Sequence, residues 1–407
     1  MMKKTKMKRV PKLRFPEFMD DWEQRKLGDL GTIQTCKRIF KEQTSEIGEI
    51  PFYKNGTIGL KADAFISKEV FEKYKQLYPY PEKGDILISA VGSIGRTAEY
   101  TGKDEYFQDS NVVWLKTDNS INKKYLKVFY QVINWLIEGS TVKHLYNDNI
   151  LKSEINFPKS FDEQGKIGQY FEHLDHLITL HQRKLEKLKE LRKGVMKKLF
   201  SQEVRFKADD GSEFSEWEKK KIGDVFFKIK DKNKDGRNQN VITNSAEFGL
   251  INQRDFFDKD IAVDGKTENY TVIKTGDFVY NPRKSKQAPY GPFNCYQLEE
   301  NGIVSPLYTC LRPKSNVNDK YLLWYFKSGS WYRFIYENGA QNGARHDRVG
   351  MTDSLMQEIP VYLPQAVEEQ QKIAECLSAL DDVIEKQKAT LAAWEELKKG
   401  LLQQMFV

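Results

Sequence analysis

The chain has 407 residues, of which 30% are charged, and a formal net charge of +7 at pH 7. This length leaves room for two or three domains, each with its own core. The net charge is weak support for a nucleic-acid partner, because the first fourteen residues alone carry seven lysines or arginines and no acid. No run of eighteen or more apolar residues occurs, so we expect no membrane partner.

Four cysteines stand singly along the chain, namely Cys36, Cys295, Cys310 and Cys376. Their spacing suits neither a zinc site nor a disulfide scaffold. This pattern favours a reducing, cytoplasmic location and predicts no structural metal.

In chain order, the first half contains a basic tail and then four short patterns. Residues 1–20 lack the apolar core of a signal peptide, and we expect them to form a solvent-exposed tail. "WEQRKLGDL" (22–30) opens a globular part, and "EKGDILIS" (82–89) predicts a tight Gly-Asp turn before a buried strand. "NKKYL" (122–126) opens a helical stretch, and "INFP" (155–158) predicts a strand that a proline ends.

The same patterns return in the same order in the second half. They read "WEKKKIGDV" (217–225), "IKTGDFVYN" (273–281), "NDKYL" (318–322) and "VYLP" (361–364). After each set comes a long helical segment, where "EQGKI" (163–167) returns as "EQQKI" (369–373). From Glu163 to Phe200 there are thirteen identities over 38 positions at an offset of 206, so this is an internal repeat.

The repeated segment has apolar residues on alternating steps of four and three, which is typical of a coiled coil. The residues predicted to form this packing face are Ile167, Phe171, Leu174, Ile178, Leu185 and Leu188 in the first copy, and Ile373, Leu377, Leu380, Ile384, Leu391 and Trp394 in the second. Each helix could pack on its own globular neighbour, or the two helices could pack on each other. Polar interruptions coincide in the two copies, His181 with Gln387 and Arg192 with Lys398, which favours mutual packing.

The sequence therefore predicts an α+β protein with an internal pseudo-two-fold repeat. Two α/β domains alternate with two long helices that pack as an antiparallel coiled coil. The predicted parts are a basic tail (1–20), a first globular domain (21–158), a first helix (159–202), a second globular domain (203–364) and a second helix (365–407).

This arrangement resembles the specificity subunit of type I restriction-modification systems across essentially the whole chain. The resemblance rests on the repeated "WEQRKLGDL" and "WEKKKIGDV", on "EQGKI" and "EQQKI", on "GSTVKHL" (139–145), and on the "LP" and "EEQ" of 363–370. It implies two target recognition domains, each of which reads one half of a split, asymmetric site in double-stranded DNA.

The resemblance also implies partners. Two methyltransferase subunits would dock on the helices, and motor and nuclease subunits would complete the complex. Methyl donor and ATP would be bound by these partners, so the chain itself would need no cofactor and would not be an enzyme.

Direct signs of catalysis are weak. "DIAVDGKT" (260–267) lacks the first glycine of a phosphate-binding loop, and "NPRK" (281–284) lacks the second proline and the aromatic ring of an amino-methyltransferase loop. His173, His176 and His181 have no cysteine or carboxylate at ligand spacing, so we expect no metal. The alternatives are a self-contained DNA methyltransferase or nuclease, and a coiled-coil scaffold that does not contact DNA.

Basic and amide side chains gather in the loops of the globular parts, where they could pair with base edges or phosphates. Lys143 and His144 precede the last strand of the first part, and we expect Arg345 and His346 to occupy the corresponding place in the second. The complete set of predicted DNA-binding residues is Lys54, Asn55, Arg96, Lys143, His144, Arg283, Lys284, Lys286, Arg345 and His346.

Overall fold

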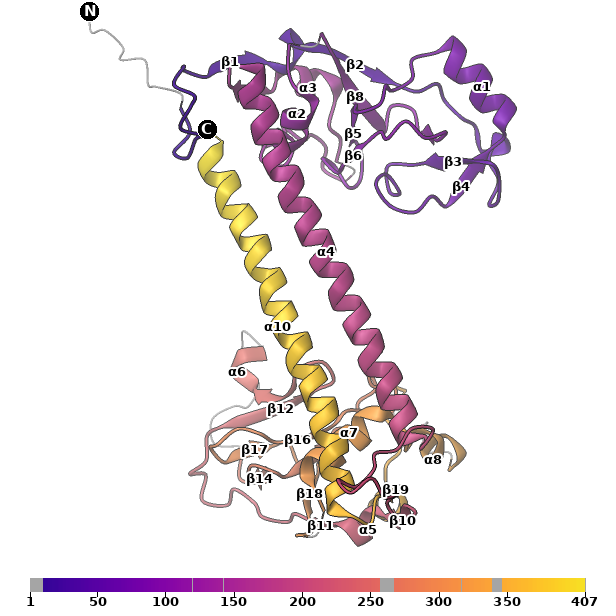
Figure 1. Cartoon of the computed structure of the whole chain (residues 1–407), viewed down its shortest axis with the longest axis vertical. Coiled ribbons are helices and arrows are strands. Elements are labelled where there is room, and N and C mark those ends of the chain that lie inside the picture. Colours follow the sequence, from indigo (N-terminus) through magenta and orange to yellow (C-terminus); the bar gives the residue numbers. More distant parts are fainter. Residues whose placement is uncertain are drawn as a thin grey trace, which may run out of the picture. The chain divides into compact units, whose positions relative to one another are not determined.

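The computed structural model describes residues 10–118, 120–141, 143–256, 267–315, 317–338 and 346–406. It divides into two compact units, Met1–Arg183 with Ala389–Val407, and Lys184–Lys388. Both divisions fall inside the long helices α4 (Phe161–Phe200) and α10 (Val367–Met405). Each unit therefore contains one globular part together with half of each long helix (Figure 1).

The globular part of the first unit is built on two small sheets. Four antiparallel strands lie in the order β2-β8-β5-β6, and three strands lie in the order β4-β3-β7. A separate antiparallel pair joins β1 to β9. The strands are β1 (Glu23–Lys26), β2 (Gly31–Thr35), β3 (Ile50–Tyr53), β4 (Ala64–Ile66), β5 (Ile86–Ser89), β6 (Thr97–Glu99), β7 (Tyr106–Phe107), β8 (Val112–Thr117) and β9 (Glu154–Phe157). The helices are α1 (Lys68–Leu77), α2 (Lys123–Phe129) and α3 (Asn147–Lys152), with short 3-10 turns at Leu27–Asp29 and Lys41–Gln43.

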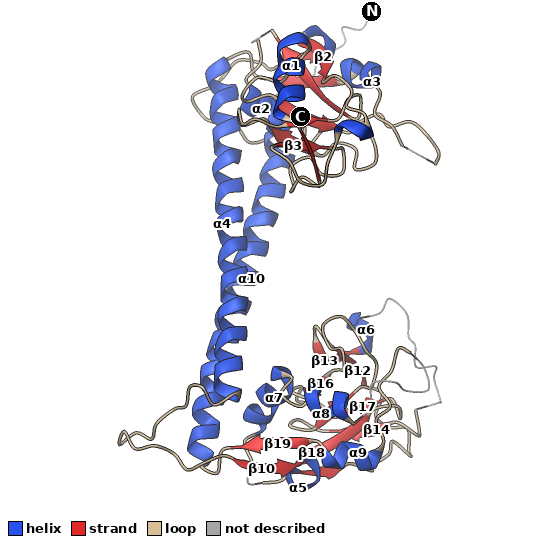
Figure 2. Cartoon of the chain, turned by 90° about the vertical axis from the view of Figure 1, so that its right-hand side faces the viewer, coloured by secondary structure: helices blue, strands red, loops and turns tan. Residues whose placement is uncertain are grey.

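The second unit has the same plan. It has an antiparallel four-stranded sheet in the order β11-β18-β15-β16, a second four-stranded sheet in the order β13-β12-β17-β14, and a pair of β10 with β19. The strands are β10 (Glu218–Lys221), β11 (Phe226–Lys228), β12 (Val241–Ser245), β13 (Gly249–Asn252), β14 (Thr271–Ile273), β15 (Phe278–Tyr280), β16 (Phe293–Cys295), β17 (Gly302–Val304), β18 (Thr309–Pro313) and β19 (Pro360–Leu363). The helices are α5 (Ile222–Val225), α6 (Gln253–Phe256), α7 (Asp319–Ser328), α8 (Tyr332–Glu337) and α9 (Asp353–Glu358). Figure 2 shows this mixture of helices and strands, which confirms the predicted α+β class.

The two units share their strand pairing, except that β14 adds a fourth strand to the second sheet of the second unit. In each, the second sheet contains one parallel pair, β3 with β7 and β12 with β17. The predicted Gly-Asp turns are present as well: Gly84 has a φ of +90° and Gly276 a φ of +88°, a left-handed conformation that favours glycine. The carboxylates that follow are buried and paired, Asp85 with Lys123 at 2.6 Å and Asp277 with Arg312 at 2.7 Å.

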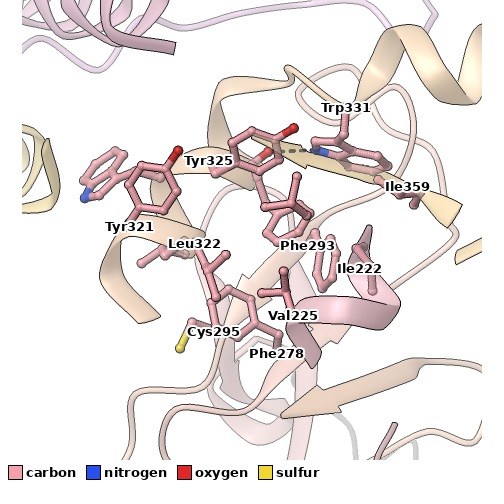
Figure 3. Close-up of a cluster of buried hydrophobic side chains, with 14 of the residues drawn as sticks. Ile222, Val225, Phe278, Phe293, Cys295, Tyr321, Leu322, Tyr325, Trp331 and Ile359 are labelled. Carbon is pink, nitrogen blue, oxygen red and sulfur yellow. Dashed lines mark hydrogen bonds between the residues drawn. The ribbon is translucent and has the colours of Figure 1, made fainter. Parts of the chain in front are cut away.

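Aromatic side chains fill the core of the second unit (Figure 3). Phe278 and Phe293 meet edge to face, with ring centroids 6.1 Å apart, and the indole of Trp331 donates a hydrogen bond to the Phe326 carbonyl at 3.0 Å. Tyr325, on α7, donates its hydroxyl hydrogen to the Pro360 carbonyl of β19 at 2.8 Å. Tyr321, also on α7, donates its hydroxyl hydrogen to the Tyr362 carbonyl of β19 at 2.5 Å, and in the first unit Tyr125, on α2, makes the equivalent bond to the Asn156 carbonyl of β9 at 2.7 Å. The cores thus tie the same helix to the same strand.

A buried glutamine in the first turn of each long helix repeats a pair of hydrogen bonds. Gln164 donates to the Pro158 carbonyl at 2.8 Å and accepts from the backbone N–H of Asn122 at 2.7 Å. Gln370 does the same with Pro364 and Asn318, at 2.8 and 2.9 Å. Each glutamine therefore joins the long helix, the end of the preceding strand and the start of α2 or α7.

The glutamate before each glutamine holds an arginine from the segment that precedes the globular part. Glu163 and Glu369 are only 1% and 0% exposed. Arg14 donates to both oxygens of Glu163 at 2.6 and 2.8 Å, and Arg205 to both oxygens of Glu369 at 3.0 and 2.9 Å. The hydrogen bonds to these glutamates raise the pKa of both guanidinium groups. We call each glutamate–glutamine pair with its partners a helix-start clasp.

The clasp corrects one expectation. Within the described part of the 1–20 segment most residues are exposed as expected, but Arg14 and Phe15 are packed, since the Arg14 side chain is 11% exposed and Phe15 meets Tyr170 edge to face. The N–H of Leu13 also donates to the carbonyl of Gln404 at 3.0 Å. Val204 makes the equivalent bond to Lys198 at 3.3 Å in the other unit. The repeat therefore begins before the first tryptophan.

The long helices pack against each other in both units, and the predicted antiparallel coiled coil is confirmed. The first unit combines the N-terminal part of α4 with the C-terminal part of α10, and the second unit combines the opposite parts. The matched polar interruptions form equivalent ion pairs. Lys398 lies 2.6 Å from Asp175 in the first unit, and Arg192 pairs with Asp381 in the second.

The residues of the predicted packing face serve two kinds of contact. Ile167, Phe171 and Leu174 belong to the core of the first unit, and Ile373 and Leu377 to that of the second. These five pack on their globular neighbours, so both alternatives hold along different parts of the helices. Of the remaining predicted residues, Ile178, Leu185 and Ile384 are also buried, and Leu188, Leu380, Leu391 and Trp394 are half-buried.

All four cysteines are free thiols. Burial raises the pKa of the thiols of Cys36, Cys295 and Cys310 to about 12, and also raises the pKa of Cys376. Within the described residues no helix is long and apolar enough to cross a membrane.

Replacing Gln164 with alanine should lower the free energy of unfolding by about 3 kcal/mol, because the variant leaves a backbone donor and a backbone acceptor without their partner. Gln182→Ala is the control, since the exposed Gln182 makes only a 3.3 Å bond to Glu395. This control should change stability by less than about 0.5 kcal/mol. Denaturant unfolding of both variants measures the difference, and equal losses would contradict a structural role for the clasp.

Candidate nucleic-acid interface

In both units the loop of one β-hairpin is hydrogen-bonded to a segment that leads back to the last strand. We call this segment, around Leu145 in the first unit and Val349 in the second, the returning segment. The hairpins are β5–β6 and β15–β16, closed by bonds from Ser89 N–H to the Arg96 carbonyl at 2.9 Å and from Asn281 N–H to the Pro292 carbonyl at 3.0 Å. In the first unit Leu145 N–H donates to the Ala90 carbonyl at 2.8 Å. In the second, Val349 N–H donates to the Pro282 carbonyl at 2.9 Å.

These equivalent bonds correct the residue correspondence expected from the sequence. Since Leu145 matches Val349, His144 matches Arg348 and Lys143 matches Asp347. Isolated β-bridges support the same correspondence, because His144 pairs with Val91 in the first unit and Arg348 pairs with Arg283 in the second. The predicted correspondence of His144 with His346 was wrong, because the stretches around them share too few letters to fix the register. His346 is exposed, and Arg345 lies outside the described residues.

A cleft of about 700 Å³ opens between the hairpin loop and the returning segment of the first unit, and we call it cleft 1. Its lining residues are Ala90, Val91, Ser110, Asn111, Glu138, the stretch 144–149 and Lys152. His144 stacks on Tyr146, with ring centroids 5.6 Å apart. Glu138 accepts a hydrogen bond from the Asn149 amide at 2.7 Å.

The structure brings several predicted residues of the first unit to this cleft or next to it. The Asn55 side-chain amide donates to the Val91 carbonyl at 2.8 Å, and Arg96 donates to the Gly56 carbonyl at 2.9 Å. Lys143 is exposed beside His144. Lys54 is held in an ion pair with Asp63 at 3.1 Å. The loops at 54–57 and 90–96 are thus fastened together.

A cleft of about 580 Å³ opens beside the equivalent hairpin loop of the second unit, and we call it cleft 2. Its charged lining residues are Glu247, Arg283, Lys284 and Arg348. The uncharged lining residues are Thr243, Asn244, Ser245, Ala246, Gln253, Tyr270, Asn281, Pro282, Ser285, Gln287, Pro292, Ser305, Leu307 and Tyr308. Lys286 is exposed on the same loop but does not line the cleft.

Buried asparagines make a fixed floor under cleft 2. Asn244 donates to the Val279 carbonyl at 2.7 Å, and Asn294 donates to the Asn244 side-chain oxygen, also at 2.7 Å. Asn281 donates to the Asn244 carbonyl at 3.2 Å and accepts from the Arg283 N–H at 3.0 Å. Buried amides are stabilising only when they are hydrogen-bonded, and this network satisfies them and orients the loop that carries Arg283.

The two clefts differ in charge. Among their lining residues, cleft 1 has two carboxylates, Glu138 and Asp148, and one lysine, Lys152. Cleft 2 has three basic side chains and one carboxylate. Arg348, which contributes to this excess, was missed by the sequence reasoning. The signal that could have found it is the spacing from glycine in "GSTVKHL" (139–145) and "GARHDRV" (343–349), where His144 and Arg348 both stand five residues after the glycine.

The other residues considered for chemistry lie apart from the clefts or outside the described structure. Within the described residues there is no group of three or more His, Cys, Asp or Glu side chains that could hold a metal ion. His173 and His176 are exposed, and His181 lies beside Trp394 with ring centroids 6.2 Å apart. All of "DIAVDGKT" except Thr267 lies outside the described residues.

Comparison with known proteins gives a consistent result. Residues 19–190 and 214–393 each match the family model described as type I restriction modification DNA specificity domain. A putative type I restriction enzyme specificity subunit of Haemophilus influenzae is 51% identical over 158 residues, which are 38% of this chain and 41% of that protein, so this match spans less than half of that relative. The putative MjaX specificity subunit of Methanocaldococcus jannaschii is 27% identical and covers 95% of this chain and 93% of its own.

Two solved structures share the fold. The specificity subunit of a type I restriction-modification system from M. genitalium superposes with a TM-score of 0.61 at 16% identity, covering 98% of this chain and 99% of its own. A chain from a structure of the type I restriction-modification system, concerned with complex assembly and conformational transition, gives a TM-score of 0.53 at 14% identity. It covers 95% of this chain and 97% of its own.

Gly291, at the end of the cleft 2 loop, should not tolerate a side chain. Its φ is +86°, and an added Cβ would lie 2.1 Å from the Asn281 carbonyl oxygen. Gly211 is a matched control, because its φ is +84° but an added Cβ would meet no atom within 4 Å. Gly211→Ala should cost about 1–2 kcal/mol of unfolding free energy from backbone strain alone, and Gly291→Ala distinctly more. Equal losses in denaturant unfolding would show that the close approach is unimportant.

Proposed function

The chain belongs to the family of type I restriction-modification DNA specificity domains, and we propose that it reads a split, asymmetric DNA site, one half with each unit. The observation that carries this proposal is the pair of clefts. Each cleft opens beside the equivalent hairpin loop of a repeated framework, where that loop meets a returning segment. A repeated framework with differently lined clefts supports two readers with different sequence preferences.

The lining of the clefts supports contact with DNA. Arginine, lysine, asparagine and glutamine side chains pair with base edges and phosphates, and in the described residues cleft 2 combines all four types. In the first unit, Asn55 and Arg96 flank the same loop that lines cleft 1. We assign these residues, together with Lys143, His144, Arg283 and Lys284, to the DNA-facing surface. Lys54, Lys286 and His346 do not line the clefts, and we assign them to phosphate contacts.

We further propose that two copies of one methyltransferase subunit dock on the long helices. Exposed apolar residues recur at equivalent helix positions, Leu191 at 52% and Leu397 at 47% exposure. Gly194 and Gly400 follow them by three residues, and an added Cβ at either would meet no atom of the described chain within 4 Å. A mid-helix glycine costs about 1 kcal/mol relative to alanine, so two equivalent ones are best explained by the close approach of the same partner twice.

Methyl transfer, ATP hydrolysis and cleavage are assigned in this proposal to partner chains, which would bind methyl donor and ATP, in the cytoplasm. Support comes from the "NPRK" stretch (281–284), whose residues all help to form cleft 2. Asn281 belongs to the amide floor, and Arg283 pairs its backbone with Arg348. A motor and nuclease subunit would join the same complex.

Methylome sequencing of a host that expresses this chain with its methyltransferase partner tests the proposed reading. We expect one methylated motif made of two short, different specified sequences separated by unspecified bases, because the two clefts present different side chains. A palindromic or uninterrupted motif would contradict the proposal.

A second test concerns catalysis. The purified chain, incubated with labelled methyl donor and DNA that contains the motif, should transfer no methyl groups, and addition of the methyltransferase partner should start transfer. The complex lacking DNA with the motif serves as the negative control. Transfer by the chain alone at a rate comparable to that of the complex would show that it is an enzyme itself.

A further inference from the structure

Arg348 occupies a special position in the second unit. It lies on the wall of cleft 2 between two backbone hydrogen bonds that its neighbours make with the hairpin loop. Lys284 N–H donates to the Asp347 carbonyl at 2.8 Å, and Val349 N–H donates to the Pro282 carbonyl at 2.9 Å. Because both flanking residues are fixed, the place from which the Arg348 side chain starts is fixed as well.

The guanidinium of Arg348 is left without an obvious structural task. Its Nε is buried, and it has no hydrogen-bond partner among the described residues. Other arginines of this unit form ion pairs with buried carboxylates, such as Arg312 with Asp277 at 2.7 Å and Arg205 with Glu369 at 2.9 Å. A buried donor without a partner costs about 1–3 kcal/mol, so its retention beside an open cleft indicates a partner that comes from outside the chain.

The surroundings narrow the chemistry of that partner. Arg283 and Lys284 line the same cleft. The Asp347 carboxylate forms an ion pair with Arg283, whose Nε lies 3.7 Å from Asp347 Oδ2. Glu247 is the carboxylate of the lining. A planar guanidinium in a positive cleft suits an acceptor pair held in one plane, and guanine presents such a pair, O6 and N7, in the major groove.

We propose that Arg348 reads a guanine in the half-site bound by the second unit. This inference rests on the proposed function and adds to it one residue and one base. The equivalent residue in cleft 1 is His144, which stacks on Tyr146 near Glu138 and cannot donate the same bidentate pair of hydrogen bonds. The guanine requirement therefore belongs to one half-site and need not recur at the matching place in the other.

The test uses the complete complex with its methyltransferase partner and compares Arg348→Gln and Arg348→Lys with the wild type by methylome sequencing. In Arg348→Gln, discrimination for guanine over other bases should fall on the order of 10- to 100-fold at one position of one half-site, because a two-pronged contact is lost. The other half-site should stay unchanged. Arg348→Lys, which keeps the charge and a single point of contact, should retain a weaker preference for guanine at that same position.

Arg333→Gln is the matched control, because Arg333 is an exposed arginine of the same unit that pairs with Glu337 on α8 at 2.6 Å. It should leave the motif as in the wild type. An unchanged motif in Arg348→Gln, or a uniform loss of methylation at all sites with the same base preferences, would overturn the proposal. The uniform loss would identify a phosphate contact.

A measurement on the wild-type complex covers the case in which the variants do not fold. Binding is compared for duplexes in which 7-deazaguanine, which lacks the N7 acceptor, replaces each guanine of the motif in turn. One guanine of one half-site should weaken binding at least about 10-fold when replaced, as expected for loss of one of two hydrogen bonds in a desolvated pair. If no guanine is sensitive, Arg348 does not read this base. Failure of the wild-type complex to methylate any split motif would instead contradict the proposed function.

Discussion

Glu163 and Glu369 bring an almost fully buried negative charge to the first turn of each long helix, and the fold is arranged to satisfy it. In each case an arginine from an upstream segment supplies two hydrogen bonds. Removing one partner of a buried ion pair costs about 3–5 kcal/mol, which makes the upstream segment, the long helix and the strand before it interdependent. The neighbouring glutamine extends this dependence to the start of α2 or α7. Four segments therefore meet at one point in each unit.

This arrangement separates the parts of each globular domain that must stay constant from those that can vary. The clasp, the paired strands β1 with β9 and β10 with β19, and the bonds of Tyr125 and Tyr321 to those strands are the same in both units. The hairpin loops and returning segments that line the clefts take no part in these shared contacts. Their length and charge differ between units while the hydrogen bonds at their bases are the same. A new lining can thus be accommodated without disturbing the clasp.

The sequence predicted well those features in which each residue has a fixed structural partner. The helical repeat was visible because Glu163, Asp175 and Arg192 have counterparts that make the same pairs. The Gly-Asp turns were visible because left-handed backbone demands glycine and the buried aspartate demands a cation.

The missed features depend on backbone contacts, which restrict residue identity weakly. The returning segments are registered by main-chain bonds, so "GSTVKHL" and "GARHDRV" share only their glycine, and Arg348 was overlooked. The upstream segments share an arginine and a phenylalanine, but five more residues separate the "RF" pair at 205 from its following "SEF" than separate the pair at 14 from "PEF". The clasp connected them only when the structure placed Arg14 and Arg205 on equivalent glutamates. The Leu13 N–H donates to the carbonyl of Gln404, which is distant in the sequence. The Val204 N–H makes the equivalent bond to the carbonyl of Lys198, which lies only a short way back along the chain. The order of the two halves along the polypeptide is consequently not imposed by the fold. A circularly permuted chain, with residues 204–406 placed ahead of residues 10–200, would join Gln404 to Leu13 through as many residues as join Lys198 to Val204, and would allow both of these main-chain bonds.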